Sequence, residues 1–190
     1  MLKNLNSKII ILASQSTRRQ DLLDDLGITF KVIVKPIKEK FPSEMQPHLI
    51  AKYLAEMKSS VFNPKKNEII ITADTVVIHN NNILNKPKNT KEAKEILSNL
   101  SGSSHEVVTG VCINQKNNQF SFSELTKVQF KALSDKEINY YVNNFNPMDK
   151  AGAYGIQDWI GKIGIKSIEG CYYNVMGLPL QKLYNYLIKL

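Results

Sequence analysis

The sequence predicts an α/β fold built on a mixed β-sheet with flanking helices. Apolar, β-branched runs alternate along the chain with amphipathic stretches of helical period. One run, Glu68–His79, is nearly all β-branched, as in a strand covered on both faces. Two further runs, His105–Ile113 and Phe120–Ala132, are separated by a short polar loop and should pair antiparallel.

The chain opens with a strand, a turn and a helix. Ile9–Ala13 is an apolar run without a breaker, and Ser14–Thr17 follows with residues that favour turns and helix caps. A helix should come next, with Leu22, Leu23 and Leu26 on one face and Gly27 at its end.

Arg18 and Arg19 fall in the first turn of that helix, where cations oppose the helix dipole. Free backbone N–H groups point outward from the same turn, and Ser14 adds a hydroxyl. Such a junction can cradle a polyanion, and a broken local rule is expected at a functional site. Two solvated surface arginines are the alternative that this segment leaves open.

A second strand, Thr29–Val34, ends at Lys35-Pro36, and Glu39 follows in a polar loop. A helix should begin at Pro47, because apolar residues recur from there at helical spacing (Ile50, Leu54, Met57 and Val61). Lys58 lies near the end of this helix, where a lysine also suits the dipole, so a purely structural role stays open.

Asp74 interrupts the apolar strand Glu68–His79, and Thr75 beside it adds a hydroxyl. A carboxylate inside such a strand is unfavourable unless it meets water, a cation or a metal. The alternative is a strand end facing solvent, but the apolar residues on both sides of Asp74 favour a functional role.

The middle of the chain continues the alternation. A turn at Asn80–Asn82 and a short strand at Ile83–Leu84 lead to Lys86, whose backbone the following proline holds extended. A solvated loop lysine is the ordinary alternative for Lys86. Thr90–Leu100 is a helix with the apolar stripe Ala93, Ile96, Leu97 and Leu100. His105 has no second ligand at metal spacing, which argues against a metal site there.

A capping box at Ser134–Glu137 starts another helix, whose core stripe is Ile138, Tyr141, Val142 and Phe145. The glycine-rich stretch 148–164 follows and contains Gln157 and Trp159, without a Walker or dinucleotide fingerprint. It can approach a ligand closely or be an ordinary surface loop. The chain should end with a short strand at Ile163–Ile168, a turn and helix start at Gly170–Pro179, and a helix with Leu180, Leu183, Tyr184 and Leu187 inside.

Composition narrows the function. The 190 residues are 43% apolar with a net charge of +8, which suits one globular domain with phosphate-bearing partners. The sequence lacks a basic stripe interleaved with aromatic residues, which argues against a nucleic-acid-binding module. No apolar run is long enough to span a membrane. Cys112 and Cys171 should be buried thiols, and we expect a soluble, cytoplasmic protein.

Six segments in order resemble the Maf family of septum-formation-inhibitor-like nucleoside triphosphate pyrophosphatases. They are ILASQSTRRQDLL, TADTVV, KP with the EAKEILSNLSG helix, HEVVTGV, MDKAGAYGIQ and YYNVMGLPL, and they extend from Ile9 to about Leu180. The resemblance implies one Maf-like domain over residues 1–190, with an elongated mixed sheet and two lobes around a nucleotide cleft. It also implies hydrolysis to a monophosphate and pyrophosphate with Mg²⁺ or Mn²⁺, a house-cleaning role in nucleotide metabolism and a link to cell-division arrest.

Carried onto matching positions, the resemblance implies that Asp74, Lys86 and Arg18 are catalytic and that Glu39 and Asp74 bind the metal. It implies substrate binding by Ser14, Arg18, Arg19, Lys58, Lys86, Thr75 and Gln157. The AYGIQ wording resembles the branch acting on dTTP and UTP, although modified pyrimidine nucleotides stay open as substrates. We expect no membrane and no stable nucleic-acid partner, and a homodimer stays open.

The chain departs from the family pattern at several positions. Thr17 replaces a usual proline, Asn85 a common glycine, Ser103 a usual polar residue such as arginine, and Asp158 the usual glycine after Gln157. The last change adds negative charge beside the expected base pocket. A nucleotide- or nucleic-acid-binding regulator of septum formation without turnover is the rival reading, and pyrophosphate release separates the two.

Overall fold

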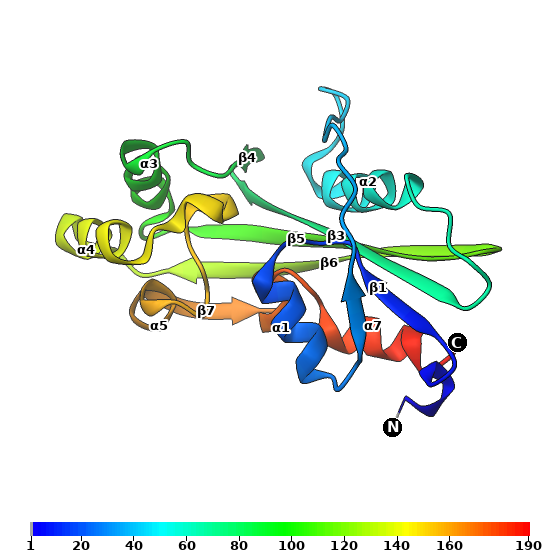
Figure 1. Ribbon diagram of the computed structural model, residues 1–190. Coiled ribbons are helices and arrows are strands. Elements are labelled where there is room, and N and C mark those ends of the chain that lie inside the picture. The colour runs from blue at the N-terminus through cyan, green and yellow to red at the C-terminus, as the bar shows by residue number, and fades with distance from the viewer. Residues whose placement is uncertain (1) are drawn as a thin grey trace. The chain divides into compact units, whose positions relative to one another are not determined.

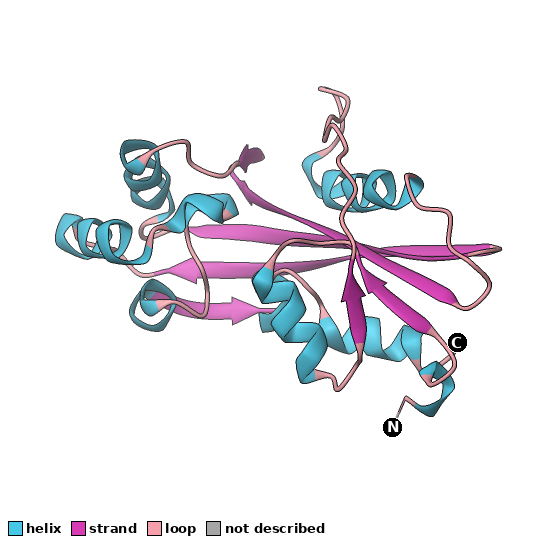
Figure 2. Ribbon diagram, in the orientation of Figure 1, coloured by secondary structure: helices cyan, strands magenta, loops and turns pink. Residues whose placement is uncertain are grey.

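The computed structural model describes residues 2–190 and contains one mixed sheet with flanking helices (Figures 1 and 2). Its strands follow the order β2-β1-β3-β5-β6-β7, and β4 pairs with β3. The strands are β1 (Ile9–Leu12), β2 (Phe30–Val32), β3 (Glu68–His79), β4 (Asn82–Leu84), β5 (Ser104–Gln115), β6 (Asn118–Phe130) and β7 (Ile165–Glu169). The helices are α1 (Thr17–Asp25), α2 (Pro47–Ser60), α3 (Thr90–Leu100), α4 (Asp135–Phe145), α5 (Trp159–Gly164), α6 (Tyr172–Met176) and α7 (Leu180–Leu187).

The strand pairings confirm the predicted mixed sheet. β1 pairs in parallel with two neighbours, so that Ile10 lies opposite Phe30 of β2 and Ile69 of β3. β4 pairs antiparallel with β3, and β7 pairs antiparallel with β6. β5 and β6 are neighbours joined by a tight turn, which only antiparallel strands allow.

The chain divides into two compact units, each made of several segments. The first unit contains the described residues up to Asp74, together with Thr109–Glu124 and Gly177–Leu190. The second unit contains Thr75–Val108 and Leu125–Met176. Strands β3, β5 and β6 each contribute residues to both units, because the divisions fall within these strands.

In the first unit, helix α2 packs tightly on strand β5. A Cβ atom at Gly110 would overlap the backbone of Ala51 and Lys52, so only glycine allows this approach. The Thr72 hydroxyl of β3 donates a 2.6 Å hydrogen bond to the Ala55 carbonyl of α2. Both contacts hold the middle of α2 against the sheet, and Lys58 lies one turn beyond Ala55.

In the second unit, α3 and α4 lie next to each other and share a core. The predicted capping box is present: the Ser134 side chain accepts from the Glu137 N–H, and the Glu137 side chain accepts from the Ser134 N–H. The shared core combines α3 and α4 with β6 and the glycine-rich segment: Leu97, Leu100, Phe130, Tyr141, Ala153 and Ile156.

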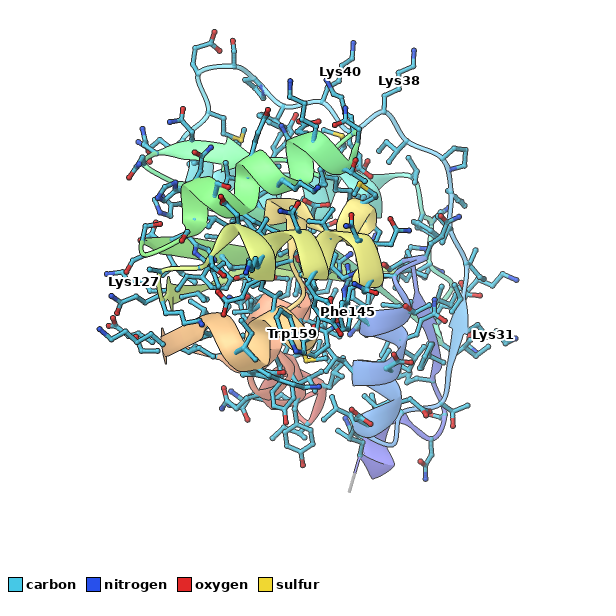
Figure 3. All side chains as sticks on the ribbon, turned by 90° about the vertical axis from the view of Figure 1, so that its left-hand side faces the viewer. Lys31, Lys38, Lys40, Lys127, Phe145 and Trp159 are labelled. Carbon is cyan, nitrogen blue, oxygen red and sulfur yellow. The ribbon has the colours of Figure 1, made fainter. Side chains whose placement is uncertain are left out.

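Several local predictions are wrong. The second strand is Phe30–Val32 and is therefore shorter than Thr29–Val34, although the Ile33 N–H still donates to the Leu12 carbonyl of β1. Of the two alternatives that the sequence leaves open for the glycine-rich stretch, the ordinary surface loop is excluded. The stretch forms short 3₁₀ turns and α5, and Gly152–Ile156 is buried. Phe145 is 37% exposed, and it lies beside Trp159 (Figure 3), with ring centroids 6.5 Å apart. Cys171 is only partly buried, whereas Cys112 is buried as predicted.

Across residues 2–190, the helices are too short or too polar for any of them to cross a bilayer.

Candidate functional site

The β1–α1 junction brings a buried serine and an arginine together. Ser14 is 7% exposed, and its Oγ accepts hydrogen bonds from the Ser16 N–H and from Arg19 Nη1, both at 3.3 Å. Arg19 also donates to the Ala73 carbonyl at 2.9 Å and to the Gly177 carbonyl at 2.8 Å. Arg19 therefore ties the start of α1 to the residue before Asp74 and to the segment before α7.

Arg18 lies in the same helical turn and is partly buried. Burial lowers the pKa of Arg19, Asp74 raises it, and the Arg18 charge lowers it further. The Arg19 guanidinium stays protonated at neutral pH because the ordinary pKa of arginine is so high. The first turn of α1 holds no acidic residue, and the Ser16 side chain makes no capping hydrogen bond. Positive charge and helix N–H groups thus coincide at this end of α1.

A second cluster joins helix α2, strand β3 and the loop before α2. The Lys58 ammonium lies 2.5 Å from Asp74 Oδ1 and 3.1 Å from Glu39 Oε1. The side chains of Lys58 and Asp74 are 18% and 14% exposed, whereas that of Glu39 is 50% exposed. The predicted conflict at Asp74 is thus resolved by a cation, as a carboxylate inside an apolar strand requires.

The segment between β2 and α2 carries Glu39 and has no helix or strand of its own (Figure 2). Lys35 anchors it: its ammonium donates to the Val61 carbonyl at 2.8 Å and lies 4.8 Å from the centre of the Phe62 ring. Lys38 and Lys40, on either side of Glu39, extend away from the molecule (Figure 3).

The same pair of carboxylates offers the oxygen ligands that a hard divalent cation prefers. Glu39 and Asp74 already converge on one positive charge, and Mg²⁺ is often held by one or two carboxylates plus substrate phosphates. Residues 2–190 contain no group of three or more His, Cys, Asp or Glu side chains able to hold a metal. The described residues therefore fit a metal ion that is coordinated partly by protein carboxylates and partly by a phosphate ligand. They do not fit a metal ion coordinated by protein side chains alone.

The other predicted residues belong to the second unit. Thr75 is partly buried in β3, and Lys86 is exposed after β4, just before the buried Pro87. Gln157 lies in the turn before α5, and its Oε1 is buried without a hydrogen-bond partner. A buried acceptor without a partner is uncommon and fits a ligand that brings its own N–H.

Two residues near Gln157 have roles in the structure that differ from those predicted from the sequence. Tyr141 was predicted only as part of a core stripe, and it is fully buried, but its OH donates to Asp158 Oδ2 at 2.7 Å. Asp158 was expected to add charge beside a base pocket. Its carboxylate is instead engaged by Tyr141, and the Lys150 ammonium lies 3.9 Å away. The sequence signal for this pair was the departure from glycine at position 158.

Sequence comparisons relate the chain to known proteins over nearly its whole length. The family model described as "Maf-like protein" matches residues 9–190. A dTTP/UTP pyrophosphatase of Phocaeicola vulgatus is 48% identical, and one of Bacteroides thetaiotaomicron is 46% identical, both over the full length of both chains. A protein of the same name from Christiangramia forsetii is 48% identical over 95% of this chain and 93% of its own. A HAM1 protein of Coxiella burnetii aligns over 65% of this chain and 73% of its own at 17% identity, with a TM-score of 0.46, too slight a likeness to carry an argument.

Proposed function

Because the chain belongs to the Maf family, we propose that it hydrolyses dTTP and UTP to the monophosphate and pyrophosphate. Three full-length or nearly full-length relatives bear the name dTTP/UTP pyrophosphatase. The observation that carries the proposal is the cluster of Lys58, Asp74 and Glu39 beside the basic start of α1. We further propose that residues 1–190 act as a single domain on the cytoplasmic nucleotide pool, in keeping with the free thiols of Cys112 and Cys171.

Cleavage between the α and β phosphates needs charge neutralisation, an aimed water and a stabilised leaving group. In this proposal Arg18 and the free N–H groups of α1 bind phosphate oxygens, and Lys58 and Lys86 add two cations. Ser14 and Arg19 shape this anion site, since Arg19 already holds Ser14 and the Ala73 carbonyl.

Asp74 accepts the proton of the attacking water in this proposal. A carboxylate that is only 14% exposed and already hydrogen-bonded is well oriented for that task. Glu39 and Asp74 would hold Mg²⁺ or Mn²⁺, which polarises phosphate oxygens when bound. Lys58 pairs with both carboxylates in the free protein and, once phosphate offers it another partner, neutralises charge on the departing pyrophosphate.

Gln157 and Thr75 would read the pyrimidine. Uracil and thymine carry an N–H at N3, whereas cytosine has a bare nitrogen there. The unpartnered Gln157 Oε1 can accept from the former and not from the latter. Changing Gln157 to glutamate should therefore alter the ratio of UTP to CTP cleavage, and an unchanged ratio would remove Gln157 from this role.

The decisive test is pyrophosphate release with Mg²⁺ or Mn²⁺ on dTTP, UTP, CTP, 7-methyl-GTP and modified pyrimidine triphosphates. The Asp74→Asn variant should lose turnover by at least a thousandfold while nucleotide binding stays measurable. Near-normal turnover in that variant would refute the role of Asp74. Binding without any turnover in the unaltered protein would instead support the rival of a regulator without catalysis.

Arg18→Ala should raise KM and lower kcat together, because the guanidinium would stabilise charge that grows in the transition state. An unchanged kcat would reduce Arg18 to substrate binding. Arg18→Lys is the matched variant: it keeps the charge and loses the bidentate fork, so partial activity is expected.

A further inference from the structure

The turn Gly155–Asp158, which carries Gln157, is bracketed by one side chain from helix α4. The Gly155 N–H donates to the Tyr141 hydroxyl oxygen at 3.0 Å, and the Tyr141 O–H donates to Asp158 Oδ2 at 2.7 Å. A single phenol therefore accepts from the first residue of the turn and donates to its last. Ile156 and Gln157 are held between these two hydrogen bonds.

The carboxylate of Asp158 is committed to this bracket. Asp158 occupies the N-cap position of α5, but its side chain makes no capping hydrogen bond and accepts from Tyr141 instead. The Lys150 ammonium, 3.9 Å from the same oxygen, offsets its charge. Burial first, and then the hydrogen bond to Asp158, raise the pKa of Tyr141, so the phenol remains a donor at neutral pH.

The backbone leaves the turn little room to shift. A Cβ atom at Gly155 would lie 2.5 Å from Asp158 Oδ2, so the carboxylate packs directly against the start of the turn. A Cβ atom at Gly161 would overlap the Ile156 carbonyl, so α5 closes the other side. Glycine at both positions allows this packing, and the turn is fixed between α4 and α5.

We propose that Tyr141 and Asp158 are positioning residues for base recognition, which hold Gln157 so that its unpartnered Oε1 meets the N3–H of uracil or thymine. The inference rests on the proposed function, because it assigns the base to Gln157. Pre-ordering matters here, because a carboxamide that rotates can also present its NH₂ group, which would donate equally well to the unprotonated N3 of cytosine. Asp158 therefore serves uracil selectivity through the turn, and its charge does not act on the substrate.

The test compares Tyr141→Phe, Asp158→Gly and Asp158→Asn with the unaltered protein. The first two remove the bracket and should lower the ratio of kcat/KM for UTP over CTP at least fivefold, mainly through the KM for UTP. Asp158→Asn keeps an acceptor for the phenol and should retain the ratio within twofold. Tyr140→Phe is the matched control on the same helix. Tyr140 is 49% exposed, and its ring packs against the rings of Phe145 and Trp159.

A second measurement does not depend on turnover. Amide hydrogen exchange across Gly155–Asp158 should accelerate at least tenfold in Tyr141→Phe and stay unchanged in Tyr140→Phe. Faster exchange with an unchanged UTP to CTP ratio would overturn the specificity role and leave a structural one. Unchanged exchange would overturn the bracket itself, whether or not the protein hydrolyses nucleotides. Failure of the proposed function would instead appear as absent pyrophosphate release in the unaltered protein.

Discussion

Replacing Lys58 with methionine should tighten metal binding while it abolishes most turnover. The Lys58 ammonium lies 2.5 Å from Asp74 Oδ1 and 3.1 Å from Glu39 Oε1, so it occupies the carboxylates that would bind a divalent cation. A metal must displace this ammonium from them. Methionine keeps most of the length and packing of the side chain and removes only the competing charge.

The size of the effect follows from the geometry. A hydrogen bond between charged groups contributes about 1.5–3 kcal/mol net. The Asp74 contact is partly buried and carries most of this, whereas Glu39 is half exposed and adds little. Removing the competitor should therefore strengthen Mn²⁺ binding by about 10- to 100-fold.

The assay is Mn²⁺ titration by electron paramagnetic resonance at neutral pH without nucleotide. Lys52→Met is the matched control: Lys52 lies on the same helix and pairs with Glu56 at 3.9 Å, so its loss should leave Mn²⁺ affinity unchanged. Equal or weaker Mn²⁺ binding in Lys58→Met would refute the reasoning. A non-hydrolysable UTP analogue should strengthen Mn²⁺ binding more in the unaltered protein than in this variant, because phosphate gives Lys58 another partner.

Three further predictions concern residues outside the cluster of Lys58, Asp74 and Glu39. Gly110→Ala should lower the free energy of unfolding by about 2–3 kcal/mol, because the new Cβ overlaps the Ala51 backbone; urea unfolding measures this, and a change below 0.5 kcal/mol would contradict it. Burial lowers the pKa of His105 to about 3. Below pH 6.5 the unfolded chain therefore binds a proton at this histidine, whereas the folded chain leaves it neutral until the pH approaches 3. Stability should fall by about 2 kcal/mol from pH 7.5 to pH 5, and His105→Phe should remove most of this fall in urea unfolding at the two pH values; an equal fall in both proteins would exclude His105 as its source. Lys35→Met should weaken Mn²⁺ binding about three- to tenfold, because the loop with Glu39 loses its anchor at the Val61 carbonyl; unchanged affinity would show that the loop is held elsewhere.

The regular elements were predictable because their signals are local. Glu68–His79 and Thr90–Leu100 have the bounds that the pattern of apolar residues predicts, and the capping box at Ser134 is present. The segment 148–164 was not predictable in this way. Gly152 is buried because Val77 packs where a Cβ would stand. Such burial depends on a partner far away in the sequence, and periodicity carries no record of it.

The candidate site divides in the same manner. Asp74 in an apolar strand and Arg18 at a helix N-terminus both conflict with local preference, and the conflict marked them for attention. The structure shows Lys58 beside Asp74, whereas the resemblance implied both residues for the site without pairing them. The sequence indicates Lys35 only as the end of a strand, because a lysine before a proline is common in loops and carries no signal of a specific contact.

Tyr141 shows why supporting residues escape a reading of the sequence. Its position in the apolar stripe of α4 is correct, and its ring is fully buried, so no local rule is broken. Its hydroxyl nevertheless joins Gly155 to Asp158, and that role exists only once α4 packs against the turn. Residues in conflict with their surroundings are visible in the sequence because the conflict is local. Residues that resolve such conflicts are satisfied by distant partners, so only the folded arrangement reveals them.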